Sequence, residues 1–116
     1  MSITNSLVIR GRAFELTKKT VTTDHTVKVG GPDYNFHEDR VILIGALTGD
    51  ITITVPNASY YGQELLIALS GAPGGYSVTV TTTTGNDYTF TAAGDYASLE
   101  YVNDVSGWIA LCSQET

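Results

Sequence analysis

The second half of this 116-residue chain is a series of short segments rich in β-branched residues, and no Lys, Arg or His occurs after residue 40. In residues 51–55, apolar and Thr side chains alternate as in a half-buried strand. Turn signals recur about every 8–12 residues, and the segments between them are 51–55, 64–69, 76–80, 88–91, 99–102 and 108–112. The sequence therefore predicts an all-β fold, a small antiparallel β-sandwich or barrel.

The length of the chain fits one domain, residues 1–116, with a β-body over residues 41–113. Residues 1–30 are less regular and end in a Gly-Gly-Pro-Asp break, so we interpret them as an extended N-terminal arm or an edge layer. The continuous apolar run at 41–44 predicts a strand buried on both faces. We see no strict internal repeat, and the best helical candidate, residues 58–64, allows a single turn.

Charge is divided unevenly along the chain, whose net charge is -6. Residues 1–40 hold all six basic side chains against five acids, whereas residues 41–116 hold seven acids and no base. This field repels a nucleic-acid backbone, which requires clustered Lys and Arg. It allows two interpretations, a soluble acidic surface or an N-terminal part that docks on an acidic partner.

Cys112 is the only cysteine, so an intrachain disulfide is excluded. Its alternation with Trp108 and Ala110 predicts a buried, inert thiol rather than a nucleophile. The N-terminus lacks the basic segment and apolar run of a signal peptide. The longest apolar run, residues 41–44, is too short to span a bilayer.

One cluster has the residue types of a metal or catalytic site. Asp33, His37, Glu38 and Asp39 lie close together, with Asp24-His25 upstream. Carboxylates and imidazole bind divalent cations, and His25 or His37 is the only base available for nucleophilic catalysis. The spacing matches no closed metal site, and acids of this loop are expected to pair with Arg40. We therefore expect no catalytic residue, no metal and no cofactor.

Six of the seven tyrosines fall in the second half of the chain, mostly at strand entrances. Tyr combines a large apolar ring with a polar tip and is enriched at interfaces. These side chains fit packing at the rim of the sandwich, contact between subunits, or stacking on a sugar. They are Tyr60, Tyr61, Tyr76, Tyr88, Tyr96 and Tyr101.

The order of strands and turns is similar to that of a known group of proteins. The matching segments are 49–56, 61–63, the Gly-rich turn 71–75, 78–80 and 106–108. Together they resemble β-modules of tailed-bacteriophage virions, found in head decoration (cement) proteins, head fibres and tail fibres. The resemblance covers about residues 41–113 and carries no catalytic signature; residues 1–40 match no family pattern.

The resemblance implies a homotrimer. The chain length favours a capsid decoration protein that sits on the outer capsid surface of the virion, is made in the host cytoplasm, and bridges subunits of the major capsid protein. Partners would then be the capsid and further copies of the chain, with no nucleic acid and no membrane. Residues assigned to capsid binding are Arg10, Arg12, Lys18 and Lys19, and those assigned to the trimer interface are Tyr60, Tyr61, Tyr101 and Trp108.

Two other functions remain open on the sequence. A carbohydrate-binding fibre module would stack sugars on Tyr60, Tyr61 or Trp108. A small hydrolase would use His37 and the acids near it.

Overall fold

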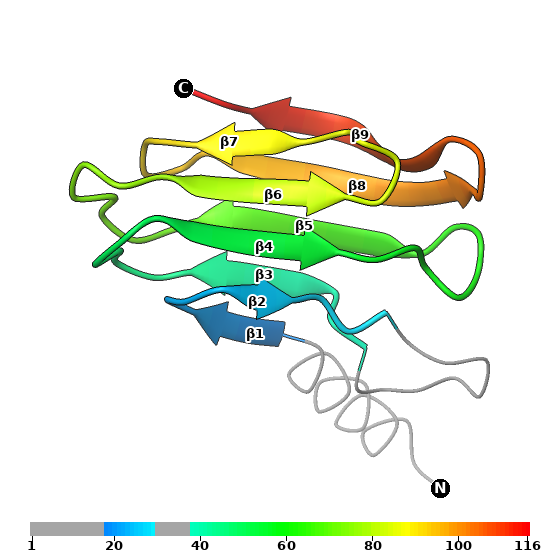
Figure 1. Cartoon of the computed structure of the whole chain (residues 1–116), viewed down its shortest axis with the longest axis horizontal. Helices are drawn as coiled ribbons and strands as arrows, with labels where there is room; N and C mark the ends of the chain where they lie inside the picture. The colour runs from blue at the N-terminus through cyan, green and yellow to red at the C-terminus, as the bar shows by residue number, and fades with distance from the viewer. Residues whose placement is uncertain (1–17, 30–37) are drawn as a thin grey trace, which may run out of the picture.

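The computed structural model describes residues 18–29 and 38–116, which form two β-sheets packed face to face (Figure 1). The five-stranded sheet has the order β1-β3-β5-β8-β9, with β1 at Lys18–Val21, β3 at Val41–Ile44, β5 at Glu64–Leu69, β8 at Tyr96–Asn103 and β9 at Gly107–Gln114. The four-stranded sheet has the order β2-β4-β6-β7, with β2 at His25–Thr26, β4 at Ile51–Val55, β6 at Val78–Thr82 and β7 at Tyr88–Phe90. The all-β sandwich is confirmed.

The prediction of an antiparallel sandwich is wrong for four of the seven strand pairs in the described residues, which are parallel. The chain alternates between the sheets from β1 to β6, and each strand runs parallel to the one two places earlier. The pairs β1–β2, β3–β4 and β5–β6 are thus three stacked coils, as in a β-solenoid. Only β7, β8 and β9 add antiparallel pairs. A strand in the opposite sheet serves here as the crossover that parallel pairing requires.

The N-terminal segment is an edge layer where the structure describes it. β1 pairs with β3, and β2 pairs with β4, so residues 18–26 supply the first coil rather than a free arm. Val27 is buried in the core, and Val21 packs against it. Residues 1–17 lie outside the described residues.

Successive coils stack closely where the chain leaves the five-stranded sheet. The Ile44 carbonyl accepts hydrogen bonds from the N–H groups of Ser70 and Gly71, at 2.9 and 3.0 Å. The Gly45 N–H donates in the same way to Val21 of the first coil. A Cβ atom on Gly71 would lie 2.1 Å from the Ala46 nitrogen, so only Gly fits this corner.

Aspartates support the opposite corners, where the chain enters the four-stranded sheet. Asp24 accepts a hydrogen bond from the N–H of Thr52 at 2.8 Å, and Asp50 accepts one from the N–H of Ser77 at 2.9 Å. In each case a side chain of one coil binds the backbone of the next. This contact supplies a partner to a backbone donor that begins a strand.

The core lies between the sheets and is built from alternate residues of each strand. Strand β4 shows this most clearly, because Ile51, Ile53 and Val55 are buried while Thr52 and Thr54 face outward, as the sequence predicted. Trp108 is fully buried, and its Nε1 donates a hydrogen bond to the Pro56 carbonyl at 2.8 Å. Buried Trp N–H groups usually find such a partner.

Strands β7 and β9 lie at the same edge of the sandwich (Figure 1), where hydrogen bonds join the two sheets. The Asn86 amide donates to the Trp108 carbonyl at 3.0 Å. Asp95 is fully buried and accepts hydrogen bonds from the N–H groups of Thr91, Ala92 and Thr116, and from the Thr116 hydroxyl. The carboxylate of Asp95 therefore holds the last residue of the chain against the turn before β8.

Cys112 is exposed, so the prediction of a buried thiol is wrong. The register of β8 with β9 passes from Leu99 opposite Ala110 to Ser98 opposite Cys112, which leaves Leu111 as an extra residue in a β-bulge. A bulge reverses the faces of the residues that follow it. Cys112 therefore points outward although Ala110 points inward.

Gly71→Ala is expected to destabilise the fold by about 2–3 kcal/mol, because its methyl group would overlap backbone atoms rather than a movable side chain. The matched control is Gly49→Ala, which has no atom within 4 Å of the new Cβ and is expected to be neutral or slightly stabilising. Urea unfolding of the two variants measures the difference. Equal stabilities would contradict the close approach of the coils at residue 71.

The hydrogen bonds to Asp95 predict a specific acid sensitivity. Burial alone would raise the pKa of Asp95, but the bonds from Thr116, Thr91 and Ala92 outweigh it and hold that pKa well below its usual range. A lowered folded-state pKa gives stability that is present above the unfolded value, about 3.9, and is lost as the pH falls below it.

Asp95→Asn should therefore be less stable than the native protein by roughly 1–3 kcal/mol at pH 7. This difference should shrink as the pH falls from 5 to 2, because only the native carboxylate becomes protonated. Urea unfolding of both proteins at several pH values tests the prediction. A difference that stays constant down to pH 2 would show that Asp95 does not supply the pH-dependent stability.

Candidate functional site

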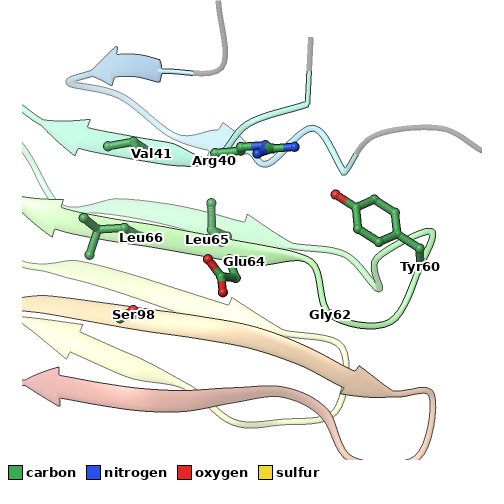
Figure 2. Close-up of a pocket in the computed structure, with 8 residues that line it drawn as sticks. All are labelled: Arg40, Val41, Tyr60, Gly62, Glu64, Leu65, Leu66 and Ser98. Atoms are coloured by element: carbon green, nitrogen blue, oxygen red, sulfur yellow. The ribbon is translucent and has the colours of Figure 1, made fainter. Parts of the chain in front are cut away.

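The five-stranded sheet carries a hollow of about 490 Å³ on the face that points away from the four-stranded sheet (Figure 2). Its floor is a register row across three strands, in which Val41 of β3, Leu66 of β5 and Ser98 of β8 lie side by side. Arg40 and Tyr60 border one end, as Figure 2 shows, and Glu64 borders the β8 side. The full lining is Arg40, Val41, Tyr60, Gly62, Glu64, Leu65, Leu66 and Ser98.

A buried carboxylate positions the polar end of the hollow. Glu38 is only 4% exposed and accepts hydrogen bonds from Nε and Nη2 of Arg40, at 3.0 and 2.8 Å. The Tyr60 hydroxyl lies 2.9 Å from both Glu38 oxygens. The sequence-based pairing of a loop acid with Arg40 is confirmed.

These contacts change the acidity of both partners. Burial, followed by the hydrogen bond to Glu38, raises the pKa of Tyr60. The hydrogen bond to Glu38 raises the pKa of Arg40. Both side chains therefore stay protonated at neutral pH and act as donors. The Arg40 side chain is still 56% exposed, so its guanidinium is accessible to a second acidic group.

We call the outward surface of the five-stranded sheet the apolar face. Strands β3 and β5, which are apolar along most of their length, turn alternate side chains toward this surface. Parallel strands with continuous apolar runs are usually covered on both faces. The outward residues, all half-buried or exposed, include Val41, Leu43, Leu66, Ala68, Tyr96 and Ile109.

Two acids lie directly opposite each other on the apolar face. Glu64 of β5 pairs in register with Glu100 of β8, and Ile109 of β9 completes this row. Like charges in directly opposite positions destabilise a sheet. Within residues 18–29 and 38–116, neither Glu64 nor Glu100 takes part in an ion pair.

The outward surface of the four-stranded sheet is different, and we call it the threonine face. Thr54 of β4 lies between Thr26 and Thr81, and Thr79 of β6 lies between Thr52 and Thr89. These six outward positions on adjacent strands are all Thr. The inner face of the same strands is mostly apolar, whereas the six outward Thr side chains are half-buried or exposed.

The described members of the predicted cluster of ligand-type residues have separate partners. His25 Nε2 lies 2.9 Å from Oδ2 of the buried Asp39, whereas Asp24 binds the backbone of Thr52 and Glu38 binds Arg40. In the part of the chain that the structure describes, no group of three His, Cys, Asp or Glu side chains is arranged to hold a metal ion. Asp33 and His37 lie outside the described residues.

The four aromatic residues assigned to a trimer interface separate into two pairs. Tyr101 and Trp108 are fully buried and pack edge to face, with ring centroids 5.5 Å apart. The hydrogen bond to Asp104 raises the pKa of Tyr101 to about 12. Neither ring is therefore available to another subunit or to a sugar. Tyr60 and Tyr61 are 40% and 63% exposed, so the surface candidates reduce to this pair.

The residues assigned to capsid binding are described only in part. Lys18 and Lys19 are exposed on β1, an edge strand of the five-stranded sheet. Arg10 and Arg12 lie outside the described residues. Sequence reasoning missed the apolar face itself, although the apolar run at 41–44 was the signal for it.

Comparison of the sequence with known proteins gives no match, either to a family model or to a curated protein. Within residues 18–29 and 38–116, no helix has the length and apolar character needed to cross a bilayer.

Tyr60→Phe should destabilise the fold by about 1–2 kcal/mol, because the buried Glu38 carboxylate loses its hydroxyl donor. Tyr61→Phe is the matched control, since its hydroxyl makes one exposed contact of 3.3 Å to Asp104, and its effect should be within about 0.5 kcal/mol. Thermal and urea unfolding compare the two. Equal losses for both variants would contradict the role of Tyr60 in holding Glu38.

Proposed function

We propose that this chain is a non-enzymatic structural protein of a tailed-phage virion, a decoration protein that forms a homotrimer and bridges capsid subunits. The observation that carries the proposal is the apolar face. A sandwich that acted alone would be expected to place polar side chains on both outer surfaces, as this one does on its threonine face. An apolar sheet surface beside a hollow has the chemistry of a protein–protein contact.

The fold supplies a rigid body for such a role. Stacked coils joined by backbone hydrogen bonds hold the two outer surfaces fixed relative to each other. A trimer presents three copies of each capsid contact, and simultaneous binding makes weak individual contacts strong together. The resemblance of residues 41–113 to virion modules supports the capsid as the partner.

The proposal gives Lys18 and Lys19 a second role besides protection of the sheet edge. Lysines on an edge strand prevent unwanted pairing with other strands. The proposal adds that, with Arg10 and Arg12, they bind an acidic region of the capsid. This contact lies at the border of the five-stranded sheet and leaves the threonine face exposed to solvent.

The test is reversal of these four charges by Arg10→Glu, Arg12→Glu, Lys18→Glu and Lys19→Glu. The variant should lose binding to capsids at least 10-fold and should remain a trimer. Co-sedimentation with purified virions, scored as a fixed ratio to the major capsid protein, measures binding. Size-exclusion chromatography with light scattering measures the trimer.

A control that adds acidic charge elsewhere is Thr26→Glu with Thr81→Glu on the threonine face, two positions separated by β4, and it should bind normally. If the four-residue variant decorates capsids as well as this control, the basic segment is not the capsid contact. If the unaltered protein never co-purifies with virions, the decoration role is wrong.

A carbohydrate-binding fibre module is the second candidate, and one observation favours it. The exposed ring of Tyr60 lines the hollow, and the neighbouring Tyr61 is 63% exposed. A sugar ring would find aromatic surface here and the Arg40 donor. Binding on a glycan array that is abolished by Tyr61→Ala would favour this function over decoration.

A further inference from the structure

We propose that the apolar face is the contact through which three copies of this chain pack around a three-fold axis parallel to the strands. The β8–β9 side of each copy would lie against the β3 side of the next, with Lys18 of the edge strand β1, which shares a row with Val41, left at the border of the contact. This inference rests on the trimer in the proposed function, and it replaces Tyr101 and Trp108 with a different set of contact residues. It does not depend on which capsid or glycan the trimer binds.

The apolar character of the face is the first argument. Val41, Leu43, Leu66 and Ala68 form a continuous outward surface on the parallel strands β3 and β5. Strands of this kind are covered on both faces in other folds. Beyond Ser98 and Glu100 of β8, Ile109 of β9 adds a further apolar side chain, 39% exposed, at the far edge of the sheet.

Charge complementarity is the second argument and indicates a second copy as the occupant. On the β8 side, Glu64 and Glu100 are directly opposite each other and have no ion-pair partner among the described residues. On the β3 side, the Arg40 guanidinium is bound to Glu38 on one side and accessible on the other. The face therefore carries an unmatched acidic pair on one side and an accessible cation on the other. Each copy supplies what the next copy lacks.

The register rows show how these parts would meet. A three-fold axis parallel to the strands keeps every row at the same height in all three copies. Glu100 and Ile109 share a row, so Ile109 of one copy reaches the hollow of the next while Glu100 approaches Arg40. Cys112 belongs to the row of Ser98, Leu66 and Val41, so it comes to the height of Val41 in the next copy.

A pairing around a two-fold axis along β5 fits the charges less well. It would place Glu64 of one copy against Glu64 of the other, in addition to the repulsion within each copy. Head-to-tail packing avoids this contact. Because each copy uses two different sides of one face, the contact is heterologous, and such contacts close into a ring of three when each copy is rotated by about 120° from the last.

The single native cysteine allows a direct test through Val41→Cys. Within one copy, residues 41 and 112 are three strands apart, about 14 Å at the usual strand spacing. A disulfide requires Cα atoms within roughly 7 Å, so it cannot form inside a copy. Mild oxidation should therefore give covalent trimers of Val41→Cys on a non-reducing gel.

Two controls accompany this variant. The native protein has only Cys112 and should give no covalent trimer. Thr54→Cys places the second thiol on the threonine face and should also give none. Covalent dimers without trimers from Val41→Cys would show a two-fold contact and overturn the three-fold arrangement. A trimer in light scattering that never cross-links would assign the contact to another face.

Glu100→Lys gives a second test whose two readouts move in opposite directions. Removing the Glu64–Glu100 repulsion should leave thermal stability equal or higher. Losing the contact with Arg40 of the next copy should weaken trimer association at least 10-fold, measured by sedimentation at several concentrations. Unchanged association would overturn the ion pair.

The experiments distinguish a failure of this inference from a failure of the proposed function. A native protein that is monomeric at all concentrations overturns the contact and the trimer together. Virion co-sedimentation still tests the decoration role separately.

Discussion

The stacking of one coil on the next at the Ile44 carbonyl is the contact on which the remaining structure depends. That oxygen accepts from two consecutive N–H groups of the following coil, and the absence of a side chain at Gly71 allows the approach. Because the corners stack, the strands of successive coils stay in parallel register, and every outward row is continuous across the sheet. The apolar face, the hollow and the threonine face all follow from that register rather than from any single strand.

The strands that sequence analysis predicted best are those whose pattern is set by burial on one or both faces. Residues 51–55 and 64–69 have the predicted boundaries, because β-branched or apolar runs there end at Pro56 and at a Gly-rich turn. The segment at 76–80 was placed two residues too early, and the segment at 88–91 was one residue too long. The last two strands were placed one to three residues too short at each end, since pairing with a neighbour extends a strand beyond its apolar residues. The alternation of apolar and polar residues correctly identified which side chains of β4 are buried.

Strand direction was not predictable from the same pattern, because the alternation of period two is identical in parallel and antiparallel sheets. The Gly-rich segments after β3 and β5 resemble hairpin turns but carry the chain to the opposite sheet. The repeat of coils was not recognised in the sequence because the coils differ in length. The one regular signal is an Asp before each of two successive strands of the four-stranded sheet, Asp24 and Asp50, and two residues are too few to reveal a repeat. The bulge at Leu111, which exposes Cys112, is set by pairing with β8 and has no local signature.

The distribution of acids explains why assembly would use the faces of the sandwich rather than its ends. Asp50, Asp87 and Asp104 lie in turns at the ends of strands, and Asp95 is consumed by internal hydrogen bonds. End-to-end stacking would bring like charges together. The threonine face is polar and is as well solvated by water as it would be by another protein, so covering it would add little stability. The apolar face is the described surface where apolar area and opposite charges occur together, because Glu64 and Glu100 lie on its strands and Arg40 directly precedes β3. In the proposed trimer the copies therefore pack sideways, with their parallel strands aligned along the three-fold axis.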